Sequence, residues 1–295
     1  MANILGVGIA TLDIINTIDG YPAENDEIRA IDRVIKRGGN ATNTLAVLSQ
    51  LGHSCAWSGV MADTPDASYI WEDLEKYHID RQAVHIHANG SLPTSYILLN
   101  RQNGSRTIVH YRNLPEYTFE DFKCIDLRAY DWIHFEGRNI ETTNRMLAYA
   151  RNSRPDAPLS VEIEKPREGI SQLFDNVSVL FFSQGYAQHC GFNNPRDFLN
   201  YIHMKTTASS LVCTWGDHGA AGMDSAKQIY VSPAFPPPHV KDTIAAGDTF
   251  NAGFIDARLR NLDFNAALES ACRLAGKKCG RFGIDGLMLN EEHYR

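Results

Sequence analysis

Residues 242–250 have types and a spacing that suit chemistry on a phosphate group. They read Asp-Thr-Ile-Ala-Ala-Gly-Asp-Thr-Phe and lead into a helical apolar pattern. Free N–H groups at such a helix start bind anions, and small residues let a phosphate approach closely. Asp248 beside that anion site would accept the proton of an attacking hydroxyl, as phosphoryl transfer requires. Taken alone, the segment also suits an Asp helix cap after a turn. The small residues concerned are Ala245, Ala246 and Gly247.

Two segments nearer the N-terminus carry polar groups suited to a sugar. Residues 37–43 read Arg-Gly-Gly-Asn-Ala-Thr-Asn, so Asn40 and Asn43 are three apart and share one helix face. Their carboxamides both donate and accept hydrogen bonds, and Gly39 would let a ligand approach the backbone. Asp13 is expected at the end of the first strand, where open parallel sheets bind ligands. The alternative interpretation of residues 37–43 is an ordinary Gly-Gly turn at a helix start. The alternative for Asp13 is a solvated turn residue.

Residues 214–219 read Thr-Trp-Gly-Asp-His-Gly directly after an apolar strand. Two glycines at that place suit the phosphates or ribose of a nucleotide, so Thr214, Gly216 and Gly219 are candidate nucleotide contacts. The same pattern also occurs in ordinary loops.

Strand-like and helix-like segments alternate along the chain. Short apolar runs predict strands, and longer amphipathic runs between them predict helices. The predicted strands are 4–9, 55–60, 132–136, 159–163, 177–182 and 211–214, and the predicted helices are 40–51, 68–77, 142–151 and 195–204. This order predicts an α/β fold with a mostly parallel sheet covered by helices on both faces.

Two stretches interrupt that alternation, at about 13–36 and 91–111. Both alternate apolar and polar residues around turn signals, and the second contains strands 94–100 and 106–111 around Gln102-Asn103-Gly104-Ser105. They predict hairpins that project from the main fold as a small sheet, either a lid over a cleft or a dimer contact. We therefore expect residues 1–295 to form a single domain with these lid strands.

Composition excludes several classes of protein. The chain has 295 residues, 43% of them hydrophobic, and a net charge of −7, which argues against a nucleic-acid partner. It shows no secretory signal and no apolar run of membrane-spanning length. Its six cysteines are scattered without a Cys-x-x-Cys motif, which favours reduced thiols and a cytoplasmic location.

Together and in this order, these elements resemble the ribokinase-like carbohydrate kinases, whose most specific mark is the loop ending Ala-Gly-Asp. Within that family the chain is similar to the ketohexokinases. The stretches that carry this similarity are 37–41, 104–108, 134–139, 162–168, 234–238 and 275–280.

The resemblance implies an α/β fold with a small β-sheet lid, ATP with Mg²⁺ as phosphoryl donor, and a ketose such as fructose phosphorylated on its 1-hydroxyl. It implies that Asp248 is the catalytic base and that the N–H groups of Ala246, Gly247 and Asp248 form the anion hole. It implies a homodimer clasped through the lid sheets. The implied sugar contacts are Asp13, Gly39, Asn40 and Asn43, and the implied nucleotide contacts are Arg106, Thr214, Gly216, Gly219 and Cys279.

Three features depart from the usual pattern of the family, and one further property stays open. Ala245 stands where the family has Gly, which costs free energy if the position needs a positive φ. The usual Asn-x-x-Glu that places magnesium is missing, so Glu162 and Glu164 are candidates for holding it through water. Arg112 is a cation where an acid is usual and could favour an anionic ligand. Dependence on a monovalent cation such as K⁺ stays open, with 242–243 as its expected place.

Three alternatives remain open from the sequence. A kinase of the same family could act on another ketose, a sugar acid or a nucleoside, or a sensor could keep the fold without turnover. A nucleic-acid-binding role is the least supported of the three.

Lys277 and Lys278 could bind phosphate, but a solvated helix face is the stronger expectation for them.

Overall fold

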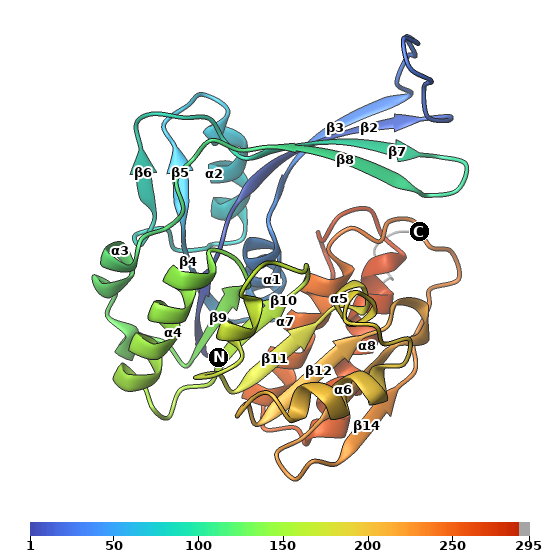
Figure 1. The fold of residues 1–295 in the computed structure, drawn as a ribbon. Coiled ribbons are helices and arrows are strands. Elements are labelled where there is room, and N and C mark those ends of the chain that lie inside the picture. The colour runs from blue at the N-terminus through green and yellow to red at the C-terminus, as the bar shows by residue number, and fades with distance from the viewer. Residues whose placement is uncertain (289–295) are drawn as a thin grey trace.

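The structure, a computed structural model, describes residues 1–288. Its main body is an eight-stranded sheet in the order β14-β13-β12-β11-β10-β9-β1-β4, covered by helices on both faces (Figure 1). The strands of this sheet are β1 (Asn3–Val7), β4 (Ser54–Ser58), β9 (Trp132–Glu136), β10 (Leu159–Ile163), β11 (Val179–Phe182), β12 (Ser210–Thr214), β13 (Ala220–Met223) and β14 (Ile229–Ser232).

The sheet is parallel from β12 to β4, and β13 and β14 are antiparallel at one edge. Its strands read as near-continuous apolar runs because both of their faces are buried. In β11, for example, Val179 to Phe182 are all buried. The predicted α/β fold with a mostly parallel sheet is confirmed.

The helices lie in two layers. In Figure 1, α4, α5 and α6 lie in front of the sheet, and α1, α7 and α8 pack together behind it. The α-helices are α1 (Asn40–Gln50), α2 (Ala67–Lys76), α3 (Phe119–Lys123), α4 (Ile140–Ser153), α5 (Gln184–His189), α6 (Pro195–His203), α7 (Ala246–Leu259) and α8 (Phe264–Cys279). Short 3₁₀ turns occur at Leu127–Ala129, Ile170–Leu173 and Gly216–His218.

A second, four-stranded sheet has the order β3-β2-β7-β8 and projects from the body as an arm (Figure 1). Its strands are β2 (Thr11–Ile18), β3 (Asp32–Gly38), β7 (Thr94–Asn100) and β8 (Arg106–Tyr111). A two-stranded sheet pairs β5 (Val60–Ala62) with β6 (His85–His87). We refer to the four-stranded sheet as the arm.

The structure corrects two expectations. Asp13 lies inside β2 of the arm, paired with Ser95 of β7, and not at the end of the first parallel strand. Lys278 is fully buried rather than on a solvated helix face. In both cases, contacts between segments far apart in the sequence decide the position, and local patterning does not report them.

No helix within residues 1–288 is long and apolar enough to cross a membrane.

Candidate active site

A cavity of about 620 Å³ opens where the parallel strands end, between the main sheet and the arm. The segments that follow β1, β9, β10 and β11 all contribute to its wall, as expected for a site at the carboxyl edge of an α/β sheet. The arm contributes alternate residues of β8, which point to one side of that strand. These are Arg106, Ile108 and His110.

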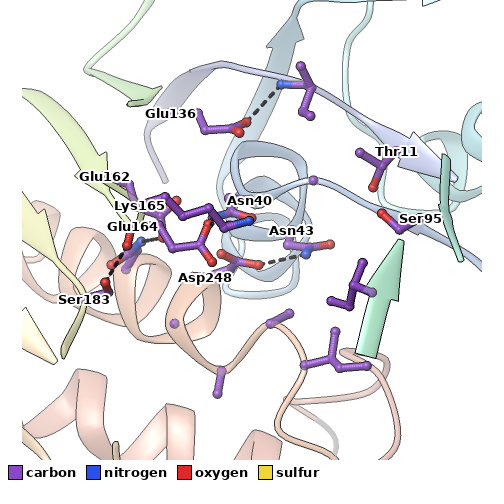
Figure 2. Close-up of a pocket in the computed structure, with 18 of the residues that line it drawn as sticks. Thr11, Asn40, Asn43, Ser95, Glu136, Glu162, Glu164, Lys165, Ser183 and Asp248 are labelled. Atoms are coloured by element: carbon purple, nitrogen blue, oxygen red, sulfur yellow. Dashed lines mark hydrogen bonds and ion pairs between the residues drawn. The ribbon is translucent and has the colours of Figure 1, made fainter. Parts of the chain in front are cut away.

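Asp248 lies at the floor of this cavity, in the first turn of α7, and is 5% exposed. Its Oδ2 accepts a hydrogen bond of 2.7 Å from Nδ2 of Asn43 (Figure 2). The Oδ1 of Asn43 accepts from Nη1 of Arg37 at 2.9 Å. Because a guanidinium only donates, this contact turns the amide so that its NH₂ faces Asp248. The sequence-predicted pair Asn43 and Asp248 is therefore brought together by a partner that was not predicted.

Arg37 is itself fixed from two further sides. Its Nε donates to Oδ2 of Asp73 at 2.6 Å, and its Nη1 donates to Oγ1 of Thr42 at 2.8 Å. A charge-assisted chain of Asp73, Arg37, Asn43 and Asp248 thus holds the carboxylate of Asp248 in one orientation.

Burial raises the pKa of Asp248 to about 8, and the negative charges of Glu164 and Glu136 add to this effect, while the Asn43 hydrogen bond opposes it. Burial and the charge of Asp248 also raise the pKa of Glu162. A carboxylate tuned toward neutral pH can take a proton from a hydroxyl far better than an ordinary aspartate. Asp248 therefore has the properties of a general base.

Backbone donors surround the same carboxylate at the N-terminus of α7. The N–H groups of Gly247 and Asp248 have no hydrogen-bond partner among the described residues, whereas the N–H of Ala246 donates to the carbonyl oxygen of Thr243 at 3.2 Å. A Cβ placed on Gly247 would meet no atom within 4 Å, so open space lies beside these donors. An anion could approach two free N–H groups, with Ala246 supporting the loop.

Ala245 precedes this helix with φ 62° and ψ 16°, in the left-handed region. The position therefore requires the positive φ that glycine adopts without cost. An alanine held there costs about 1 kcal/mol, so the surrounding contacts must hold the loop in place.

The residues expected to hold a sugar lie along one side of the cavity. Asp13 Oδ1 accepts from Thr11 Oγ1 at 2.9 Å, and burial raises the pKa of Asp13. Asn40 Nδ2 donates to Glu164 Oε2 at 3.1 Å, beside the same space. Gly39 has φ 106°, and a Cβ on it would lie 2.1 Å from the carbonyl oxygen of Ile9. Gly39 thus serves a close approach of chain to chain rather than of ligand to backbone.

Several cavity residues were missed by the sequence analysis. Ser95 and His110 pair with Asp13 across three neighbouring strands of the arm, and Ser95 Oγ lies 3.2 Å from His110 Nδ1. Alternation along 106–112 was the signal that could have found His110. Glu136 accepts from the N–H of Ile9 at 3.1 Å (Figure 2). It lies in the stretch 134–139 that carries the family resemblance, but the sequence analysis assigned it no role.

Arg112 lines the cavity but is already paired. It forms an ion pair with Glu116, which also accepts from Arg138 Nη2 at 2.8 Å, and Arg138 in turn contacts Glu136 at 3.2 Å. The two arginines hold the pKa of Glu116 below its usual value against the effect of burial. The charge of Arg112 is thus committed to this network, which weakens the expectation of an anionic acceptor.

A second cavity, of about 390 Å³, adjoins the first and shares Arg106, Thr214, Ala246 and Gly247 with it. Its wall is largely apolar and includes Phe235, Pro236, Pro237, Val240, Phe250 and Ala275. The predicted nucleotide contacts Gly216, Gly219 and Cys279 also line it. A Cβ on Gly219 would lie 2.1 Å from the carbonyl oxygen of Ser232, so this glycine is required by strand packing.

The carboxylates of the first cavity suit a hard cation held partly by other ligands. Glu162 is 8% exposed; its Oε1 accepts from Asn251 Nδ2 at 3.1 Å, and its Oε2 has no partner within residues 1–288. Within the same residues, no group of three His, Cys, Asp or Glu side chains could hold a metal ion unaided. A buried, unpartnered carboxylate oxygen beside a polar cavity suits a hydrated Mg²⁺.

The chain belongs to the pfkB family of carbohydrate kinases, whose family model matches residues 1–289. It is 40% identical to ketohexokinase of Mus musculus over 97% of this chain and 98% of that protein. It is 23% identical to ribokinase of Bacillus subtilis over 98% of this chain and 96% of that protein. The crystal structure of ribokinase from Thermotoga maritima superposes with a TM-score of 0.81 at 17% identity, covering 98% of this chain and 100% of that one. The predicted family and fold are confirmed.

The raised pKa of Asp248 predicts how stability depends on pH. In the unfolded chain Asp248 has an ordinary aspartate pKa of 3.8, whereas in the folded protein its pKa is about 8. The stability that the bound proton confers on the folded state is therefore lost as pH rises from 3.8 to about 8. Asp248→Asn removes this loss. In ligand-free denaturant unfolding, we expect the variant to gain at least about 1 kcal/mol on the wild type between pH 5 and pH 8. Asp217→Asn, at an exposed site, is the control, and an equal gain there would contradict the assignment.

The backbone of Ala245 predicts a stabilising substitution. Ala245→Gly should raise the free energy of unfolding by about 0.5–1 kcal/mol, because glycine adopts positive φ without strain. Ala246→Gly, one residue later in ordinary helical conformation, should not stabilise the protein. Thermal unfolding of both variants checks this, and a loss of stability in Ala245→Gly would show that the loop is not strained.

Proposed function

We propose that the protein is an ATP-dependent sugar kinase that transfers the γ-phosphate of ATP to the 1-hydroxyl of a ketohexose, most specifically fructose. One observation carries this proposal. Asp248, with its raised pKa, and the free N–H groups of Gly247 and Asp248 lie where a polar cavity and a largely apolar cavity meet. The similarity to a ketohexokinase over nearly the whole chain supports the choice of acceptor.

The transfer requires a proton acceptor and donors for the transferred group. The carboxylate of Asp248 takes the proton of the acceptor hydroxyl, the resulting oxygen bonds to the γ-phosphorus, and the bond to the β-γ bridging oxygen breaks to release ADP. The N–H groups of Gly247 and Asp248 would donate to the phosphoryl oxygens, with the loop residues Ala245 and Ala246 shaping that site.

The acceptor would lie between the arm and α1. Asp13, Asn40 and Asn43 would contact its hydroxyls, while Gly39 brings the start of α1 close enough to do so. Ser95 and His110 are further polar groups on the same wall. We propose that the arm acts as the lid of this single domain, since β8 of the arm lines the same cavity as the first turn of α7.

The apolar cavity would receive the adenine ring, with Cys279 at its wall and Thr214, Gly216 and Gly219 along the ribose and phosphates. Arg106 lines both cavities, so it would contact the phosphates between them. Magnesium, when bound with ATP, neutralises phosphate charge. Glu162 and Glu164 are the residues that would hold it through water.

We propose a homodimer formed through the outer face of the arm. Tyr96 and Val109 are cross-strand neighbours that are 50% and 65% exposed, and Tyr111 beside them is 54% exposed. Large apolar side chains gathered on one face of a strand pair favour a partner. Sedimentation should show twice the chain mass of 32.9 kDa, and Val109→Asp should yield monomers. Val231→Asp, at an exposed residue of β14, is the control; a monomeric wild type would contradict the proposal.

A cytoplasmic location is proposed from the cysteines, none of which forms a disulfide. Free thiols are usual in reducing compartments. Cell fractionation tests this, and recovery of the protein from an oxidising compartment would contradict it.

The proposed activity is tested by ADP release from ATP and Mg²⁺ with ketoses, ribose, glucose, sugar acids and adenosine as acceptors. We expect fructose to give the highest kcat/KM and a 1-phosphate by NMR. Asp248→Asn should lower kcat by about 100-fold or more with little change in binding, because it removes a positioned general base. Asp156→Asn, at an exposed residue outside both cavities, is the control.

Other results would change the proposal. If a sugar acid or a nucleoside is the preferred acceptor, the proposed acceptor changes but the phosphoryl-transfer mechanism stays. ATP binding without turnover would indicate a sensor. Full turnover in Asp248→Asn would overturn the role of that residue.

Arg106→Ala should mainly raise the KM for ATP, since it removes a charge-assisted phosphate contact.

A further inference from the structure

A row of polar side chains crosses the face of the arm that borders the cavity. Asp13, Ser95 and His110 occupy paired positions on β2, β7 and β8, and all three line the cavity. Neighbouring strands lie about 4.8 Å apart, so the row extends about 10 Å across the arm. His110 lies at its end, on the edge strand β8.

Hydrogen bonds within this row decide which ring nitrogen of His110 carries the proton. Burial raises the pKa of Asp13, and hydrogen bonds from Thr11 and Ser95 oppose that shift. The hydroxyl of Ser95 therefore donates to the Asp13 carboxylate, and its oxygen accepts from a second group. That group is Nδ1 of His110, which lies 3.2 Å from Ser95 Oγ. The neutral ring then carries its proton on Nδ1 and presents Nε2 as an acceptor.

The surroundings of His110 favour this neutral ring. Burial lowers the pKa of His110 from 6.5, and the positive charges of Arg138, Lys165 and Arg112 add to this effect, whereas Asp13 opposes it. The Nε2 atom has no hydrogen-bond partner among residues 1–288. His110 therefore offers the cavity one lone pair and no second donor.

The place of His110 along β8 decides which end of an acceptor it meets. Arg106, four residues earlier on the same side of the strand, lines both cavities, whereas His110 lines only the larger one. Four residues of strand span about 13 Å. An acceptor whose reacting hydroxyl lies at Asp248, close to the phosphates, would thus extend its other end toward His110.

Resting on the proposed kinase function, we propose that His110 is a specificity-determining residue for the acceptor. Its Nε2 accepts a hydrogen bond from a hydroxyl at the end of the sugar remote from the phosphorylated one. Because an acceptor-only nitrogen needs a donor, it selects a hydroxyl over a carboxylate or an unprotonated phosphate oxygen at that place. A site built to hydrogen-bond a hydroxyl also discriminates against the analogue that lacks it.

Calorimetry with a non-hydrolysable ATP analogue and Mg²⁺ measures fructose binding without turnover. His110→Phe keeps a ring without the acceptor, so it should weaken fructose binding about three- to tenfold. His110→Gln, whose Oε1 can accept, should restore most of this loss. His189→Phe, at an exposed residue of α5 outside both cavities, is the control. Equal affinity for fructose in the wild type and His110→Phe would overturn the proposal.

Fructose derivatives that each lack one hydroxyl identify the group that His110 contacts. Loss of the contacted hydroxyl should weaken binding to the wild type and cause no further loss in His110→Phe, because the two changes remove the same hydrogen bond. If every derivative loses as much affinity in His110→Phe as in the wild type, the residue contacts no hydroxyl and the proposal is wrong.

A measurement without ligand separates this inference from the proposed function. Side-chain ¹⁵N NMR of the ligand-free protein reports the tautomer of each histidine, and the signals of His110 are those absent from His110→Phe. We expect a neutral ring protonated on Nδ1 at neutral pH. A ring protonated on Nε2 would overturn the inference even if fructose were phosphorylated. The Nδ1 form in a protein that turns over no sugar would count against the proposed function alone.

Discussion

The burial of one carboxylate at the positive end of a helix is the constraint on which the site depends. Asp248 is almost fully enclosed, yet it lies among the free backbone donors of the first turn of α7. Burial favours its protonated form, and the hydrogen bond from Asn43 limits that effect. A residue in this position can take a proton from a hydroxyl while the neighbouring N–H groups receive the charge of the transferred phosphoryl group.

The rest of the fold holds that residue in place from several directions. Arg37 at the base of the arm orients Asn43, and Asp73 before the end of α2 orients Arg37. From the other side, Lys278 of α8 holds Asp242 at the start of the loop. These contacts connect the arm and the helices α1, α2 and α8 to the chain around the start of α7. They account for a loop that keeps Ala245 in a left-handed conformation.

The fold could be predicted from the sequence because it leaves local signals, and the candidate centre at Asp248 leaves local signals as well. Apolar runs marked the strands, and small residues before Asp248 marked the start of α7. Prediction from the sequence failed where the position of a residue depends on contacts between segments that are distant along the chain. Asp13 was expected at the end of a parallel strand but lies within β2 of the arm, and Lys278 was expected in solvent but is buried. Ser95 and His110 join Asp13 only through strand register, which no single segment reveals.

A crystal structure with ADP, aluminium fluoride, Mg²⁺ and fructose tests the central claim most directly. Aluminium fluoride takes the place of the phosphoryl group in transfer. The account predicts that its fluorines accept hydrogen bonds from the N–H groups of Gly247 and Asp248, with the 1-hydroxyl of the sugar on the Asp248 carboxylate. An aluminium fluoride bound away from the start of α7, or a sugar whose hydroxyls do not contact Asp248, would contradict it.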